Sequence, residues 1–311
     1  MAGCRNAPET VQQIIGRLEA QMIYLALLHG QHRVDLVTED DIAVDGILSK
    51  YDVLHVAGEW IDHRVPAKLE AWVRAGGILY ASGGLGILNE FNEPDPAMQK
   101  VLGLSAVETS KNLAVIRPVM ELPVAPPIGE ITFDGSRIPA VGLKQVLTPA
   151  DAKVLGTWAD GKPAVTVREL GTGKVFAVGT LAGCCYLRTG LPVQPFARGG
   201  NLCPVTPTTF DPAAGRLARL GVDAKPIEEP AVCDNPYVEA IVMDGPAGSV
   251  LTLANWTSEP VRNLKVRVRL AARPKEVRSV QAGRAVPAEF KDGVLTLTTD
   301  LEWADHVLLP K

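Results

Sequence analysis

The sequence has little that would tie it to a metal, a nucleic acid or a membrane. Its five cysteines (Cys4, Cys184, Cys185, Cys203 and Cys233) form no C-x-x-C pair of the kind that zinc sites use. The formal charge of −4 supplies no basic field for nucleic acid. The apolar runs near the start are too short for a membrane span or a signal-peptide core. We therefore expect no metal, no cofactor, no nucleic-acid or membrane partner, and buried free thiols in a cytoplasmic protein.

Aromatic residues are also scarce, at 5% of the chain. This leaves few flat apolar rings on which a sugar could stack. Trp60 follows a glycine in an expected loop, so it is the one tryptophan that we expect to be exposed. We expect the other four to pack in cores. These are Trp72, Trp158, Trp256 and Trp303.

What the sequence does contain is material for two packed domains, since it has 311 residues of which 47% are hydrophobic. Near the start, apolar residues at three- and four-residue steps predict a helix over 10–29. Predicted strands follow at 33–38, 51–57 and 78–81, with a helix over 66–75. This alternation predicts a parallel sheet covered by helices. Such a sheet usually opens with a strand, so the first strand is missing or is replaced by residues 1–9.

The sequence changes character after about residue 104. Short strand candidates at 114–116, 130–133 and 154–158 precede a hairpin of 163–168 and 174–178 that turns at glycines. A helix over 211–220 begins at an Asp211 cap, and 223–230 is typical of a linker. Beyond it only strands are predicted, which indicates a small antiparallel β-sandwich. They lie at 237–243, 250–255, 261–270, 277–281, 294–298 and 306–309.

Four segments carry a resemblance to a known family. These are IYLALLHGQHRVDLVTEDDI (23–42), YDVLHVAGEWIDHRVPAKLEAWVRAGGILYASGG (51–84), DGKPAVTVRELGTGKVFAVGTLAGCCYLR (160–188) and VLTLANWTSEPVRNLKVRVRL (250–270). They resemble the C-terminal half of family 42 β-galactosidases. The resemblance implies a class I glutamine-amidotransferase-like (flavodoxin-like) α/β domain with β insertions over 1–222. A linker over 223–230 and a C-terminal sandwich over 231–311 follow.

The resemblance also implies an absence of catalysis. The family's two catalytic glutamates lie in a TIM barrel of about 250 residues, and this chain has no eight β–α units to form one. The amidotransferase-like fold would place its nucleophilic cysteine at Gly84, which has no side chain. Ser82 stands two positions early. We therefore expect no catalytic residue.

A degenerate ligand site remains a second hypothesis. Open α/β sheets place ligands beyond the carboxyl ends of their strands, where His63, Glu90 and Glu93 could also gather, although such acids are equally typical of a solvated loop. Gly171–Lys174 is expected to be a hairpin turn, because it lacks the spacing of a phosphate loop. The candidate ligand-binding residues are Glu59, Trp60, Ser82, Gly83, Gly84 and Asn89.

These observations favour a structural, oligomerisation module of a glycoside-hydrolase-like protein. A small-ligand site in the degenerate pocket and a carbohydrate site on the sandwich are the alternatives. We expect self-association, as a trimer through the resemblance and otherwise as a dimer. The expected partner is a TIM-barrel glycosidase domain in cis or in trans.

Overall fold

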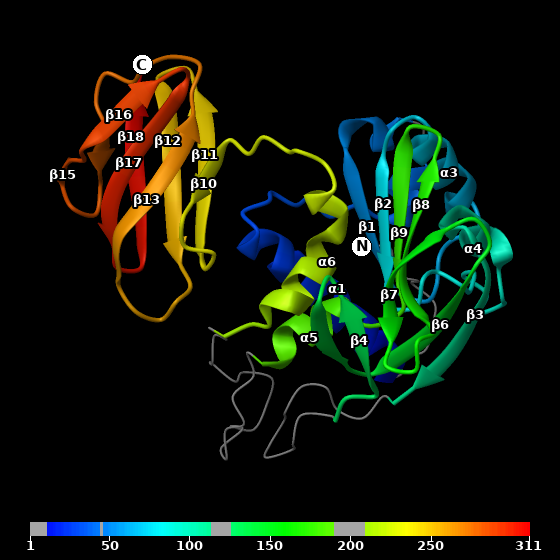
Figure 1. Cartoon of the computed structure of the whole chain (residues 1–311). Helices are drawn as coiled ribbons and strands as arrows, with labels where there is room; N and C mark the ends of the chain where they lie inside the picture. Colours follow the sequence, from blue (N-terminus) through cyan, green and yellow to red (C-terminus); the bar gives the residue numbers. More distant parts are fainter. Residues whose placement is uncertain (1–10, 44–45, 113–125, 190–208) are drawn as a thin grey trace. The chain divides into compact units, whose positions relative to one another are not determined.

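The computed structural model describes residues 11–43, 46–112, 126–189 and 209–311 (Figure 1). The strand candidate at 114–116 and a cap at Thr10 lie outside these residues. The chain forms two compact units. The first holds the described residues up to Ala26, from 35 to 189 and from 209 to 226, and the second holds 27–34 and 227–311. The predicted boundaries at 222 and 230 stay a prediction.

The first unit alternates helices and strands before it turns to strands alone, as the sequence predicts. Its elements are α1 (Val11–His29), α2 (Glu39–Ala43), the 3₁₀ helix η1 (Ile47–Lys50), β1 (Val53–Ala57), α3 (Val65–Arg74), β2 (Ile78–Ser82), α4 (Pro96–Leu102), β3 (Leu104–Lys111), β4 (Gly129–Phe133), β5 (Ser136–Ala140), β6 (Leu143–Pro149), β7 (Lys153–Trp158), β8 (Pro163–Leu170), β9 (Gly173–Val178), α5 (Ala182–Arg188) and α6 (Pro212–Asp223). None of the described helices is long and apolar enough to cross a bilayer.

The main sheet has seven strands in the order β1-β2-β9-β8-β7-β4-β5. β1, β2 and β9 are parallel, as predicted for β1 and β2, whereas β8, β7, β4 and β5 continue antiparallel. The sheet is therefore mixed, and the prediction of a parallel sheet holds for three strands only. The cause is the short β8–β9 hairpin, because two strands joined by a tight turn must run antiparallel.

The predicted strand at 33–38 is wrong, since residues 32–38 take no regular structure. Val37 packs against the edge of the buried cluster of this unit, but Leu36 is 63% exposed, and the segment forms no ladder with the sheet. Among the described residues β1 has only β2 as a partner and forms one edge of the sheet.

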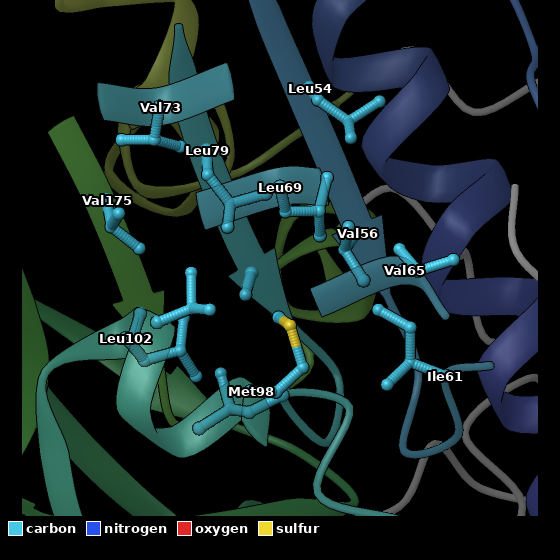
Figure 2. Close-up of a cluster of buried hydrophobic side chains, with 14 of the residues drawn as sticks. Leu54, Val56, Ile61, Val65, Leu69, Val73, Leu79, Met98, Leu102 and Val175 are labelled. Atoms are coloured by element: carbon cyan, nitrogen blue, oxygen red, sulfur yellow. The ribbon is translucent and has the colours of Figure 1, made fainter. Parts of the chain in front are cut away.

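Helices cover both faces of the parallel part of the sheet, because its strands are apolar on both sides. Leu54, Val56 and Leu79 point from β1 and β2 toward α3 and α4, where Leu69 and Met98 complete a buried cluster (Figure 2). α6 packs on the opposite face of the sheet. A Cβ added to Gly221 in α6 would lie 3.0 Å from the Cβ of Tyr80, so glycine allows this helix to approach β2 closely.

The start of α6 supports a first testable prediction. Asp211 Oδ1 accepts hydrogen bonds from the backbone nitrogens of Ala213 (2.8 Å) and Ala214 (3.1 Å), as the predicted cap requires. We expect Asp211→Ala to lower the free energy of unfolding by about 1 kcal/mol, because two amides of the first turn lose their acceptor. Asp211→Asn keeps an acceptor and is the control. Equal urea midpoints for Asp211→Ala and the unmodified chain would contradict the prediction.

The second unit is built of antiparallel strands and confirms the predicted sandwich. A four-stranded sheet runs β10-β13-β17-β16 and a five-stranded sheet runs β11-β12-β18-β14-β15. One buried apolar cluster takes side chains from both sheets, such as Val266 from the first and Leu251 from the second. The strands are β10 (Ala231–Cys233), β11 (Val238–Gly245), β12 (Gly248–Asn255), β13 (Val261–Arg269), β14 (Arg278–Ser279), β15 (Arg284–Ala285), β16 (Ala288–Lys291), β17 (Val294–Leu301) and β18 (Ala304–Pro310).

The tryptophans that the structure buries and those that it exposes differ from the expectation. Trp158 is buried, and its Nε1 donates to the carbonyl of Gln145 at 2.9 Å. Trp256 and Trp303, which were expected in a core, are 54% and 66% exposed. Each stands just outside a strand, after β12 and before β18, where no facing sheet covers it. Trp60 is half-buried.

Candidate functional site

The turn after β2 has an unusual backbone. All four residues from Gly83 to Gly86 have positive φ angles, at 68°, 129°, 67° and 60° in chain order. One of them, Leu85, is a branched residue that is fully buried. A side chain in this left-handed region costs roughly 1–2 kcal/mol, which the burial of the leucine offsets. The chain therefore turns sharply at the carboxyl end of β2, where open α/β sheets place their sites.

The side chain of Glu59 fills the space next to Gly84 in this turn. A Cβ built on Gly84 would overlap the Glu59 side chain at Cγ and would lie 2.8 Å from its Cα. The carboxylate of Glu59 is itself held by Lys111 Nζ, at 2.7 Å from Oε1 and 2.8 Å from Oε2. Glu59 is almost fully buried. The position that the resemblance assigns to a nucleophile therefore has no room for any side chain.

Ser82 lies on the other side of the same turn and is also engaged. It is fully buried, and its Oγ donates to Glu19 Oε1 at 2.9 Å. The same carboxyl group accepts from the backbone nitrogens of Gly183 (3.1 Å) and Cys184 (3.0 Å) at the start of α5. Glu19 thus joins α1, β2 and α5 through three hydrogen bonds. Ser82 donates to a carboxyl group that two backbone amides of α5 also hold, so it does not form the serine–histidine pair of an activated hydroxyl.

The pKa directions around Glu19 all favour uncharged groups. Burial raises the pKa of the Glu19 carboxyl, against the lowering effect of its hydrogen bonds to Gly183, Cys184 and Ser82. Burial also raises the pKa of the Cys184 thiol well above its usual value, and the nearby Glu19 adds to the rise. A reactive cysteine needs the opposite shift, because the thiolate is the nucleophile. Cys184 and Cys185 are buried free thiols, as expected, although α5 places them in a helix.

Asn89 lies in the loop over 87–95, which directly follows the turn, and Trp60 contacts this loop. Trp60 Nε1 donates to Asn92 Oδ1 at 2.9 Å. Asn89 Oδ1 accepts from the backbone nitrogens of Phe91 (3.0 Å) and Glu93 (2.9 Å), and Asn89 Nδ2 donates to Glu93 Oε2 at 3.1 Å. The hydrogen bonds of Trp60 and Asn89 therefore fix the conformation of this loop.

His63 and Glu90 form an ion pair between the start of α3 and the same loop. Together with Asp62 they make a group whose ligand-type atoms all lie within 4.8 Å of one another. Asp62 is already paired with Arg64, whose Nε lies 2.9 and 3.0 Å from its two carboxylate oxygens. The hydrogen bond from Arg64 lowers the pKa of Asp62. These charges satisfy one another, and the expectation of no metal stays a prediction.

The structure brings four of the six candidate residues together, since Glu59, Ser82, Gly83 and Gly84 meet at the turn after β2. Asn89 lies in the loop over 87–95, which directly follows that turn, and Trp60 contacts the same loop. That these residues bind a ligand stays a prediction. Sequence reasoning missed Glu19 and Lys111. Glu19 had a signal, because it falls at the spacing of the apolar stripe between Leu18 and Met22, where a carboxylate is unexpected. Lys111 had none, since nothing local pairs it with a residue 52 positions away.

The polar groups of this turn hold its conformation. Its carboxylates and hydroxyl are each committed to a partner within the fold. Among the described residues, no histidine contacts Ser82 or Cys184. A pair of carboxylates free to serve as acid and base would require Glu19 and Glu59 to be released from their partners.

The sequence matches the family described as "Beta-galactosidase trimerisation domain" over residues 9–189, which is more than half of the chain. No curated protein sequence matches the chain.

Solved structures share the fold at low sequence identity. A catalytic mutant of a GH42 β-galactosidase from G. stearothermophilus is 15% identical with a TM-score of 0.60, over 94% of this chain and 36% of that one. The β-galactosidase from Bacillus circulans sp. alkalophilus is 17% identical with a TM-score of 0.59, over 94% and 37%. An α-L-fucosidase from Paenibacillus thiaminolyticus is 16% identical with a TM-score of 0.56, over 94% and 45%. The chain thus spans well under half the length of these enzymes.

Proposed function

We propose that this chain, which belongs to the family of β-galactosidase trimerisation domains, is a non-catalytic assembly module of a glycoside hydrolase. The match covers all strands of the mixed sheet and the helices α1 to α5, and it ends before α6. The structures that resemble it over nearly its whole length are glycosidases in which it corresponds to only 36–45% of the chain. Its task is then to hold subunits together while another part performs the chemistry.

The observation that carries this proposal is the filling of the turn after β2 by Glu59. In a glutamine-amidotransferase-like fold a strained strand-to-helix turn exposes the nucleophile. Here the backbone strain remains, with Leu85 at a φ of 67°, while the exposed nucleophile is replaced by a glycine beneath a buried ion pair. A turn that keeps this backbone but is filled by Glu59 supports the proposal that the domain derives from an amidotransferase-like fold. In this chain the former nucleophile position has become part of the packed interior.

The same proposal assigns the finer organisation. Residues 1–222 form the amidotransferase-like, trimerisation-like domain, 223–230 the linker and 231–311 the C-terminal sandwich. The predicted partner is a TIM-barrel glycosidase domain, in cis or in trans, and the predicted location is cytoplasmic. Sequencing the DNA directly upstream tests this partner, because an in-frame reading frame for a barrel would place the module in cis.

Self-association gives the direct test of function. We expect the purified chain to form a closed trimer, because assembly is the role for which its family is described. Sedimentation velocity from low to high micromolar concentration measures the mass of the assembly. A strictly monomeric species at every concentration would remove the proposal.

Activity gives a second, independent test. We expect no hydrolysis of aryl-galactosides or of glutamine above the buffer rate, because the polar groups around the turn are committed to partners in the fold. Glu59→Gln and Ser82→Ala are the diagnostic variants. Hydrolysis that either substitution abolishes would show that the turn after β2 is a working site.

A further inference from the structure

The two outer faces of the C-terminal sandwich differ sharply in polarity. Outward-pointing residues of the four-stranded sheet are charged or hydroxylated, among them Lys265, Arg267 and Arg269 on β13 and Thr296 and Thr298 on β17. None of the exposed large hydrophobic residues described for the chain lies on this sheet. Six of them belong to the five-stranded sheet or to the residues next to its strands: Ile241, Met243, Trp256, Val280, Trp303 and Leu308.

The five-stranded sheet presents its apolar side chains in cross-strand rows. Met243 pairs with Val250, which pairs with Leu308. The next row joins Ile241, Thr252 and His306, with a 3.0 Å contact between the Thr252 hydroxyl and His306 Nδ1. The last row joins Glu239, Ala254 and Ala304. We call these outward residues of β11, β12 and β18 the apolar face.

A sheet face of this kind is costly to leave in water. Met243 is 56% exposed and Leu308 is 39% exposed, so burying their apolar surface against a partner is favourable. Single exposed hydrophobic residues are normal on any protein. Adjacent ones in register across three strands instead mark a contact surface.

We propose that the apolar face binds the same face of a second copy of this chain across a two-fold axis. The proposal rests on how charge is placed around the face. Glu239 lies on β11 in the last row, and Arg278 lies on β14 in the row of Leu308. They lie at diagonally opposite ends of these rows, and the outward residues of β11, β12 and β18 between them include no lysine, arginine or second carboxylate. The Arg278 guanidinium also lies 4.0 Å from Glu276, in an exposed pair that leaves it accessible.

This placement is self-complementary. A two-fold axis in the plane of contact, perpendicular to the diagonal, brings Glu239 of one copy opposite Arg278 of the other, and the pair forms twice. The rows of apolar side chains then pack against each other as two sheets do in a sandwich, about 10 Å apart. The pairing of opposite charges at the rim sets the register of the two faces.

This contact goes beyond the proposed trimer, because the family match ends at residue 189 and the apolar face lies wholly after it. Trimer and two-fold contact together give an assembly with an even number of chains. The two-fold contact alone gives a dimer.

Sedimentation velocity on the full chain tests the contact through Met243→Lys. We expect this variant to halve the number of chains in the assembly, because it places a charge among the apolar side chains of this face on both copies. The matched control is Thr298→Lys, which adds the same side chain to the outward face of the other sheet and should leave the mass unchanged.

Charge reversal tests the register. Glu239→Arg and Arg278→Glu should each weaken the two-fold contact about tenfold, since like charges then meet twice, and the double variant should restore most of the affinity. A trimer whose mass does not respond to Met243→Lys would overturn this inference and leave the proposed function standing. A monomer would overturn both, and a dimer abolished by Met243→Lys would support the contact and contradict the trimer. Two single reversals that the double variant fails to rescue would also refute the pairing.

Discussion

Replacing Gly84 with alanine is expected to lower the free energy of unfolding by about 3 kcal/mol, one of the two largest effects that we predict. The added Cβ would lie 2.8 Å from Glu59 Cα and 2.9 Å from Glu59 N, both backbone atoms that cannot move aside cheaply. Overpacking of this kind costs about 1–3 kcal/mol. The positive φ of 129° adds a penalty of about 1–2 kcal/mol for any residue with a side chain. Urea denaturation followed by circular dichroism measures the loss at a fixed protein concentration.

Gly58 provides the matched control for this experiment. It has a φ of 141°, similar to that of Gly84, but a Cβ added there would meet nothing within 4 Å. Gly58→Ala should therefore show only the backbone penalty. The difference between the two variants in the free energy of unfolding measures the cost of the steric overlap between the added Cβ and Glu59. Equal losses would mean that Glu59 can move away, and that the turn after β2 has space for a ligand.

The steric overlap with Glu59 should also prevent a cysteine from being introduced at position 84 as a nucleophile. Gly84→Cys places its thiol where Glu59 stands, so we expect an unstable protein without glutaminase activity. A stable, active Gly84→Cys variant would show that the proposed scaffold retains an open site.

Local signals in the sequence were enough to predict most elements of the fold. The glycines at 171 and 173 indicated the hairpin that β8 and β9 form, and Asp211 indicated the start of α6. Alternating patterns such as that of β13 indicated the sandwich. These features depend on neighbours within a few residues, so the sequence alone reveals them.

Elements whose structure depends on distant partners could not be predicted in this way. The segment over 33–38 has the composition of a strand, yet Leu36 remains exposed because the sheet ends at β1 among the described residues. The exposure of Trp303 depends on where the facing sheet stops. The Glu59–Lys111 pair joins residues 52 positions apart, and only the folded chain brings them together.

The role of Glu19 also depends on residues far away in the sequence. Its substitution is the second of the two changes with the largest expected effect on stability. We expect Glu19→Ala to lower the free energy of unfolding by about 3 kcal/mol. The substitution leaves Ser82 Oγ and the nitrogens of Gly183 and Cys184 without their acceptor inside the protein, and each such buried donor costs about 1–3 kcal/mol. Removal of the buried carboxyl recovers part of this cost. Gln21→Ala, at an exposed position of the same helix, is the control and should change stability by less than about 0.5 kcal/mol.

The pH dependence of this effect follows from the raised pKa of Glu19. Between its pKa in the unfolded chain and its higher pKa in the folded protein, the folded state binds more protons, so stability falls as pH rises. The contribution of Glu19 is thus greatest in acid and smallest above its folded pKa. Glu19→Gln carries no titrating group at this position, so it lacks this dependence.

Comparing Glu19→Gln with the unmodified chain at each pH removes the contributions of all other groups. The stability of the variant minus that of the unmodified chain should increase from about pH 4.5, the ordinary pKa of the carboxyl, and then level off. Urea midpoints taken at intervals upward from about pH 4.5 give this curve. A difference that stays constant or decreases over this range would mean that folding does not raise the pKa of Glu19. The three hydrogen bonds to Glu19 would then outweigh the cost of its burial.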